Sequence, residues 1–378
     1  MTTVVCLVAN TLYYPVGGGH RWAYLNWALG LKSLGCQVVW MEGVERGTTA
    51  RELKEYVAAL EDDLRPYGLA DHVALCSWEG QALPRDSQNG LLSLDDAAEA
   101  DLLLNLRYDL EPGILRRFSR TALLDIDPGL LQTWMAAGQV RVWRHDVFFT
   151  TSEALVKGEA RFPDGGIRWH HAPPCVALEW WPPVEAENGA PWSTVSHWGS
   201  YDDWAMDGDM VYLNDKKVGF EPFLDLPRHT EQPLELALRL GEDQDGERLD
   251  LERRGWRVRS SLEAASSAAD YRRYIQSSLG EFSCAKPSCV RLRNAWISDR
   301  TLCYLASGKP AVVQHTGPSE LLPDNAGLFR FKDLGEAVSA LEEAASGYER
   351  HRRLARELAE ECFDAKKVAG ALLERALP

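Results

Sequence analysis

Short apolar runs separated by helical segments fill the first half of the chain. Residues 3–9 (TVVCLVA) form a continuous apolar run, and a helix is expected from His20 to Leu34, where Gly35 provides its stop. An uninterrupted apolar run is typical of a strand buried on both faces of a parallel sheet, with helices as the crossover connections. The alternation therefore predicts an α/β fold with a doubly wound parallel sheet.

The same alternation continues toward the middle of the chain. Thr49 and Glu52 have the spacing of a capping box, which predicts that a helix begins there and runs to about Arg65. Further strands are expected at residues 36–41, 72–76, 101–106, 121–126 and 147–151. Strands separated by helices in this way favour parallel pairing within one layer.

A proline-rich stretch, residues 172–191, interrupts this pattern with five prolines in twenty residues. Proline breaks both helices and sheets, so we place the connection between two domains here. An irregular aromatic stretch is expected up to about Pro227. Strands are then expected at 194–198, 256–259, 281–284, 310–314 and 327–331, helices at 268–278 and 298–307, and a helical end over the last 45 residues. Two such halves predict two facing Rossmann-like domains, with ligands beyond the carboxyl ends of both sheets.

Composition excludes several classes of protein. The 378 residues include 41 Lys and Arg against 56 Asp and Glu, a formal charge of −15, which disfavours a sequence-independent nucleic-acid binder. No run approaches 18 apolar residues, so no membrane span is expected, and the start of the chain resembles a strand more than a signal peptide. The eight scattered cysteines form no CxxC pair, which predicts free thiols in a reducing, cytoplasmic compartment.

Three glycines and a histidine, Gly17 to His20, lie between the first expected strand and helix. Their backbone amides could face an anion at the helix start. A dinucleotide site would use Glu42 as its ribose-binding acid, but Gly17 comes eight positions after Ala9, too late for the tight turn. Trp22 stands where the third glycine of that fingerprint belongs. His20 could act as a general base or form only a local hydrogen bond.

A second candidate site spans residues 285–300. Ser298 is a plausible N-cap for the expected helix to residue 307. The free amides of its first turn, with Lys286 and Arg300, would form a compact anion site that suits a diphosphate. The alternative is a capped helix with solvated charges and no ligand.

Paired carboxylates and clustered tryptophans give weaker signals. Asp125 and Asp127, at a strand end, could hold a divalent cation or merely cap the next helix, and we expect no metal site. Trp198 belongs to a group of tryptophans near the proline-rich stretch that could line a cleft for a sugar or an aromatic molecule, although most tryptophans are core residues. No G-x-S-x-G motif and no Walker A motif occurs.

Residues 296–317 (WISDRTLCYLASGKPAVVQHTG) resemble the donor domain of GT-B glycosyltransferases, in particular a bacterial group-1-like subfamily. The Gly17–His20 segment and the later GLKSLG at residues 30–35 are similar to the opening of the acceptor domain in many such enzymes. The resemblance implies an acceptor-binding domain at 1–180, a donor-binding domain at 181–363, and a final helix at 364–378 that crosses back. It also implies a deep cleft between the two domains.

Individual residues carry over from this resemblance. Ser298, Asp299 and Arg300 fall where the donor phosphate or sugar would lie, and Thr316 and Gly317 form the next loop facing the donor. His20 matches the base of inverting relatives. On the acceptor side, we expect Gly18, Gly19, Asp127 and Trp198. Cys303 occupies the position where many retaining members have a glutamate, so the contacts of that glutamate are not transferred.

The resemblance implies a metal-independent, hexosyltransferase-type glycosyltransferase. Its co-substrate would be a nucleotide-diphosphate sugar, no other cofactor is expected, and the acceptor would be a hydroxyl of a natural product or carbohydrate. Nucleic acid is not expected as a partner. The alternatives are a nucleotide-sugar epimerase of the same fold and a non-catalytic sugar-nucleotide-binding protein. The donor base, the sugar, the acceptor and the oligomeric state are left open by the sequence.

Overall fold

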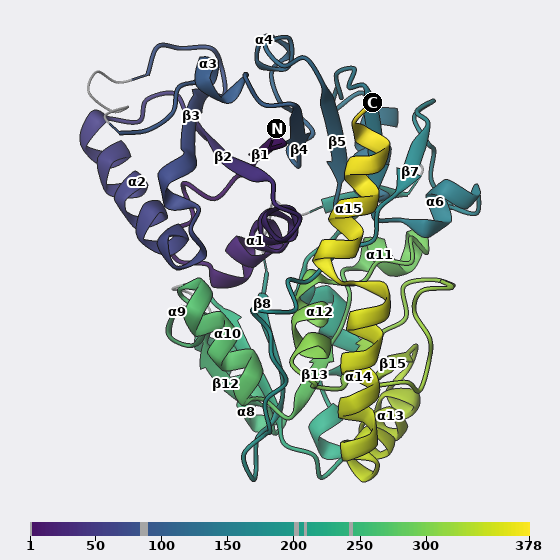
Figure 1. Ribbon diagram of the computed structural model, residues 1–378. Helices are drawn as coiled ribbons and strands as arrows, with labels where there is room; N and C mark the ends of the chain where they lie inside the picture. The colour runs from purple at the N-terminus through teal and green to yellow at the C-terminus, as the bar shows by residue number, and fades with distance from the viewer. Residues whose placement is uncertain (1, 84–89, 200–203, 208–209, 242–244) are drawn as a thin grey trace.

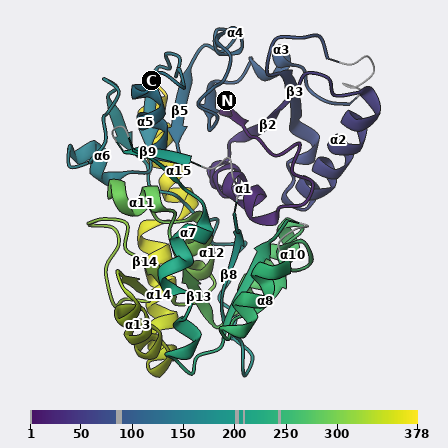
Figure 2. The same cartoon turned by 180° about the vertical axis from the view of Figure 1, so that it is seen from behind.

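The computed structural model describes residues 2–83, 90–199, 204–207, 210–241 and 245–378. It shows two lobes, each built on a parallel sheet with helices on both faces, and the last two helices run along both lobes (Figure 1). Figure 2 shows the opposite side, where α11 of the second lobe lies below α5 and α6 of the first lobe.

The first lobe contains a seven-stranded sheet in the order β3-β2-β1-β4-β5-β6-β7, with every neighbouring pair parallel. Its strands are β1 (Val4–Val8), β2 (Gln37–Val44), β3 (Val73–Ser77), β4 (Leu102–Asn105), β5 (Thr121–Asp125), β6 (Val147–Thr150) and β7 (Trp169–His171). Its helices are α1 (Gly18–Ser33), α2 (Ala50–Leu64), α3 (Leu94–Ala97), α4 (Pro112–Leu115), α5 (Leu130–Ala136) and α6 (Glu153–Lys157). The central strands are buried on both faces, as their apolar runs predict.

The second lobe contains a six-stranded parallel sheet in the order β12-β11-β8-β13-β14-β15. Its strands are β8 (Trp192–His197), β11 (Leu234–Arg239), β12 (Arg257–Ser260), β13 (Gly280–Ser283), β14 (Ala311–Gln314) and β15 (Leu328–Phe331). An antiparallel hairpin is formed by β9 (Trp204–Asp207) and β10 (Met210–Leu213). The helices are α7 (Lys216–Phe220), α8 (Asp245–Arg253), α9 (Ser261–Ala264), α10 (Ala268–Ser277), α11 (Pro287–Leu292), α12 (Asp299–Ala306) and α13 (Leu334–Ser346).

Two consecutive helices, α14 (Tyr348–Cys362) and α15 (Ala365–Ala376), connect the lobes (yellow in Figure 1). Arg356 in α14 donates to the carbonyl oxygen of Ala306 at the end of α12, at 2.7 Å. The start of α15 lies so close to α1 that a Cβ on Gly30 would come within 2.5 Å of the Ala365 carbonyl oxygen. The chain therefore returns to the first lobe after completing the second.

Most of the expected elements are present, and several further elements were missed. Thr49 and Glu52 form both hydrogen bonds of the expected capping box. The strand β11 was missed because Glu235 and Arg239 break its apolar pattern; Glu235 accepts a hydrogen bond from the Tyr274 hydroxyl at 2.8 Å. The short strand β7 was also missed. The stretch expected to be irregular up to Pro227 contains the β9–β10 hairpin and α7.

Candidate functional site

A small hollow lies at the carboxyl ends of β13 and β14, at the start of α12. We call it the second-lobe hollow, and it is lined by Ser283, Cys284, Ala285, Trp296, Ile297, Ser298, Thr301, Val313, Gln314 and Thr316. The Ser298 hydroxyl accepts from the Arg300 amide at 3.3 Å, so the expected N-cap is present. The Thr316 hydroxyl donates to the Trp296 carbonyl oxygen at 2.6 Å. The positive end of the α12 dipole therefore faces this hollow, between two strand ends.

Lys216 is a buried cation beside this hollow that the sequence analysis missed. Its Nζ donates to the carbonyl oxygen of Cys284 at 2.6 Å and lies 5.6 Å from the centre of the Trp296 ring. Burial is the main cause that lowers the pKa of Lys216 to about 7, and the charges of Arg300 and Lys286 contribute to this shift. An anion in the hollow would restore the full charge of this amine. The sequence signal was hidden because Lys216 begins a five-residue helix in the stretch expected to be irregular.

The Arg300 guanidinium forms its hydrogen bonds inside the protein and not in the hollow. Its Nε donates to Glu281 at 2.8 Å, and its Nη1 donates to the Val195 carbonyl oxygen at 2.9 Å. Glu281 is fully buried in β13, so a nearby cation is required to balance its charge. This placement corrects the expectation that Arg300 itself grips a diphosphate: its guanidinium is bonded to Glu281 and Val195, and Arg300 does not line the hollow.

His20 and Asp127, both from the first lobe, act on Asp299 at the start of α12. Burial raises the pKa of Asp299, while the charges of Arg300 and His20 lower it and that of Asp127 raises it. The His20 Nε2 lies 2.6 Å from the carbonyl oxygen of Asn10, which can only accept, so Nε2 carries the proton and Nδ1 has the lone pair. The fold therefore brings these three expected residues into one region between the lobes.

Asp125 accepts a hydrogen bond from the backbone of Asp127 and so holds that turn in place. One Asp125 oxygen accepts from the Asp127 amide at 3.0 Å, and the other accepts from Gln132 at 2.7 Å and Thr150 at 3.2 Å. Burial raises the pKa of Asp125 to about 7. In the described part of the chain, no three His, Cys, Asp or Glu side chains are grouped as a metal would require.

The glycines before His20 form a contact between the lobes. The amides of Gly17 and Gly18 donate to the carbonyl oxygens of Ser266 and Ala265, at 2.8 and 3.0 Å. A Cβ on Gly18 would lie 2.0 Å from the Ser267 carbonyl oxygen, and one on Gly19 would lie 2.7 Å from the Tyr271 ring. This geometry corrects the expected role of Gly18 and Gly19 beside an acceptor. Because the glycines have no side chains, Ser267 and Tyr271 can pack directly against them, and this space is filled by the α10 region and not by a ligand.

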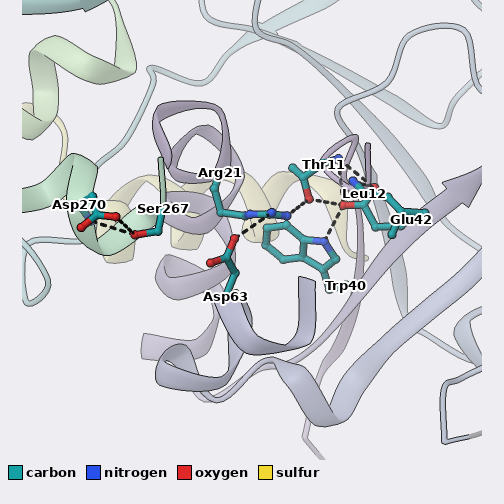
Figure 3. Close-up of polar contacts among 8 residues, drawn as sticks. All are labelled: Thr11, Leu12, Arg21, Trp40, Glu42, Asp63, Ser267 and Asp270. Atoms are coloured by element: carbon teal, nitrogen blue, oxygen red, sulfur yellow. Dashed lines mark hydrogen bonds and ion pairs between the residues drawn. The ribbon is translucent and has the colours of Figure 1, made fainter. Parts of the chain in front are cut away.

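A buried network fixes the loop that leads to these glycines (Figure 3). Glu42 accepts from the amides of Thr11 and Leu12 at 2.9 and 3.2 Å, from the Trp40 indole at 2.9 Å, and from the Thr11 hydroxyl. Arg21 donates to that hydroxyl and pairs with Asp63 at 3.0 Å. The Glu42 carboxylate is thus bonded to groups of the protein itself, which argues against a role as a ribose-binding acid.

The structure also places the remaining expected site residues. Trp198 is not on the acceptor side: it is 1 % exposed in the second-lobe core, packs on Phe220, and donates to Glu247 at 3.1 Å. Gly317 has a φ of 138°, and a Cβ there would lie 2.7 Å from the Arg293 carbonyl oxygen. Lys286 is the N-cap of α11. Cys303 is fully buried in α12, so no carboxylate occupies that position.

No protein-family model and no curated protein sequence matches the chain. Solved structures do. They include Anabaena Alr3699/HepE in complex with UDP and glucose (12% identity, 99% of each chain covered, TM-score 0.59) and sucrose-phosphate synthase from Thermosynechococcus elongatus (12%, 99% and 98%, 0.56). A third is an alpha-glucosyltransferase in complex with UDP-glucose and DNA containing an abasic site (10%, 100% of each chain, 0.57).

These neighbours are GT-B glycosyltransferases, and the two parallel sheets of this chain have the same arrangement. The chain therefore has the GT-B fold, as the resemblance of residues 296–317 implies. Within the described residues, no helix has the length and apolarity needed to cross a membrane.

Proposed function

We propose that this chain is a glycosyltransferase that moves a sugar from a nucleotide-diphosphate sugar to a hydroxyl of a small molecule. The observation that carries the proposal is the group of cations beside the second-lobe hollow. The charges of Arg300 and Lys286 both act on Lys216, in a chain of net charge −15. Such a group, at the start of α12 and at strand ends, is suited to a diphosphate.

In this proposal the donor diphosphate lies over the start of α12. The Lys216 ammonium provides the direct contact, because its Nζ now has one carbonyl partner, the Cys284 oxygen, and two further N–H donors. Ser298, Asp299, Thr316 and Gly317 form the surrounding turns and contact the phosphates or the sugar. Positive charge at this point stabilises the diphosphate as it leaves, which is an electrostatic contribution of about 3 kcal/mol for each well-placed donor.

We assign the general base to His20, for a reaction in which the sugar inverts its configuration. The acceptor oxygen forms a bond to the anomeric carbon while the bond from that carbon to the diphosphate oxygen breaks. The electron pair leaves with the nucleoside diphosphate, and the hydroxyl proton goes to His20 Nδ1, the nitrogen not used by Asn10. The Asp299 carboxylate, on which the charge of His20 acts, stabilises the resulting imidazolium. No metal takes part.

The neighbouring structures support a UDP-linked donor. Alr3699/HepE was solved with UDP and glucose, and the DNA-bound alpha-glucosyltransferase was solved with UDP-glucose. We therefore propose a uridine diphosphate sugar as the first donor to test, with a hexose as the transferred group.

Incubation of the full chain with a panel of nucleotide sugars, with and without hydroxyl acceptors, tests the proposal. We expect release of the nucleoside diphosphate that depends on the acceptor, together with a glycosylated product detected by mass spectrometry. Isomerisation of the sugar without an acceptor would instead identify an epimerase. Binding of a nucleotide sugar without turnover would identify a non-catalytic binding protein.

A further inference from the structure

One buried side chain, Asn294 between α11 and α12, joins the wall of the second-lobe hollow to the first lobe. It is 2% exposed. Its Oδ1 accepts a hydrogen bond from the backbone amide of Trp296 at 3.0 Å, and Trp296 lines the hollow. Its Nδ2 donates to the backbone carbonyl oxygen of Pro128 at 2.8 Å, and Pro128 directly follows Asp127. A single amide group therefore connects the proposed donor site to the turn that carries Asp127.

The first-lobe end of this connection is the turn at residues 125–129, which we call the Asp127 turn. The Gly129 amide donates to the Gln132 side chain at 2.6 Å. Leu292, the last residue of α11, belongs to an apolar cluster whose other members come from the first lobe. A Cβ on Gly129 would lie 2.7 Å from Leu292. The Asp127 turn is thus in direct contact with α11, at the border between the lobes where Figure 2 shows α11 below α5.

The backbone on both sides of Asn294 is strained. Arg293 has a φ of 51° and Ala295 a φ of 57°, and only one other described non-glycine residue has a positive φ. Residues with a Cβ adopt this region rarely, and they keep it where the surrounding structure holds them. The Ala295 amide donates to the Thr316 carbonyl oxygen at 3.0 Å, and the Ser152 hydroxyl donates to the Asn294 carbonyl oxygen at 2.9 Å. Partners from both lobes therefore hold one strained segment.

We propose that Asn294 is a positioning residue, which fixes the Asp127 turn against the donor site once a diphosphate is bound. This inference rests on the proposed function. A diphosphate over the start of α12 contacts the wall of the hollow and orders the strained segment behind it. The Asn294 amide extends this order to the first lobe, because it accepts from Trp296 and donates to Pro128 at the same time. A segment that the donor has already ordered costs less to order again when the acceptor binds.

Hydrogen–deuterium exchange of the full chain, with and without UDP, tests this proposal. In the wild type, we expect UDP to slow exchange at the start of α12 and also in a peptide that covers residues 129–136, each by about fivefold or more. In the Asn294→Ala variant, we expect the protection at the start of α12 to remain and the protection of residues 129–136 to be lost. The remaining protection at α12 also shows that the variant is folded.

A second variant separates the two hydrogen bonds of Asn294. Asn294→Asp keeps an oxygen for the Trp296 amide but cannot donate to Pro128 as a carboxylate. With an acceptor that turns over, we expect kcat/KM for that acceptor to fall by about tenfold or more, as it should in Asn294→Ala, while the affinity for UDP stays within about twofold. Agreement between the two variants excludes an effect of the added charge.

Ser319→Ala is the matched control. The Ser319 hydroxyl donates to Glu153 at 2.6 Å, which is another hydrogen bond between the lobes, and Ser319 does not line the second-lobe hollow. We expect this variant to keep the protection of residues 129–136 by UDP and the wild-type kcat/KM for the acceptor.

The inference and the proposed function fail in different ways. Two results would overturn the inference and leave the glycosyltransferase standing: UDP protects α12 but not residues 129–136 in the wild type, or it protects both regions equally in Asn294→Ala. A wild type in which UDP protects neither region would overturn the proposed donor site and the inference with it.

Discussion

The amino group of Lys216 donates a hydrogen bond to the backbone carbonyl oxygen of Cys284, at the carboxyl end of β13; the distance between nitrogen and oxygen is 2.6 Å. This contact places a buried amine at the proposed diphosphate position, and burial lowers its pKa to about 7. A bound diphosphate favours the protonated amine, so binding takes up a proton and weakens as the pH rises above about 7.

We therefore expect the affinity for UDP to fall as the pH rises from about 7 to about 9. The fall is up to about a hundredfold, because each pH unit above the pKa of the free amine lowers its protonated fraction about tenfold. Calorimetric titrations across this range measure the effect. The Lys216→Met variant should bind weakly with little dependence on pH in this range. Parallel profiles for the wild type and the variant would show that Lys216 does not contact the diphosphate.

His20 provides a prediction about catalysis. Replacement His20→Gln removes the free nitrogen but keeps an amide that can donate to Asn10, so the loop should stay in place. We expect kcat for acceptor-dependent UDP release to fall about 10²–10⁴-fold with UDP affinity unchanged. His229→Gln, at an exposed position in the second lobe, is the control. A kcat within about twofold of the wild type would exclude His20 as the base.

Asp125 provides a prediction about the pH dependence of stability. Its pKa in the folded chain is about 7, well above the ordinary value of 3.8. Between these two pH values, the folded state therefore keeps a proton on Asp125 that the unfolded state loses. This contribution is complete below about pH 4 and is lost as the pH rises through about 7. We expect the free energy of unfolding of the wild type to decline by about 2–4 kcal/mol over this range relative to Asp125→Asn.

Urea denaturation at a series of pH values measures this difference. Asp71→Asn, at an exposed position, should follow the wild-type curve. If Asp125→Asn also follows it, then Asp125 does not titrate as its burial implies.

The contact between Gly18 and α10 provides a prediction about the lobes. Gly18→Ala places a methyl group 2.0 Å from the Ser267 carbonyl oxygen, which is backbone and cannot rotate away. We expect a loss of about 1–3 kcal/mol in the free energy of unfolding, and a larger radius of gyration by small-angle scattering. Gly370→Ala in α15 makes only ordinary contacts with Leu34 and should be neutral or slightly stabilising. Equal stability of the two variants would contradict this packing.

The sequence predicts those parts of the fold that depend on local pattern. The apolar run at residues 3–9, the Thr49–Glu52 capping box and the Ser298 cap each involve neighbours in the chain, and all are present. The strand β11 was missed because the partners of Glu235 are distant in sequence: Tyr274 of α10 donates a hydrogen bond to it, and Arg259 of β12 lies 3.9 Å away.

The candidate site was harder to predict because its charges are set by distant partners. Nothing near Arg300 in sequence shows that Glu281 lies against it, and nothing near Lys216 shows that it is buried against Cys284. Likewise, Gly18 and Glu42 suggest ligand contacts from spacing alone, whereas the structure uses them for α10 and for the Thr11 loop. Trp198 was misplaced because a tryptophan in a cleft and one in a core have the same local sequence pattern.

The proposed glycosyltransferase function depends most on the binding of the donor diphosphate by Lys216 and the start of α12. Calorimetric titration of UDP into the wild type, Lys216→Met and Lys217→Met tests it directly. Lys217 is the matched control, because it is the next residue in α7 and its amine forms a partly exposed ion pair with Glu247 of α8. We predict that the wild type and Lys217→Met bind UDP alike and that Lys216→Met binds at least about tenfold more weakly. Equal binding by all three, or no binding by the wild type, would contradict the account.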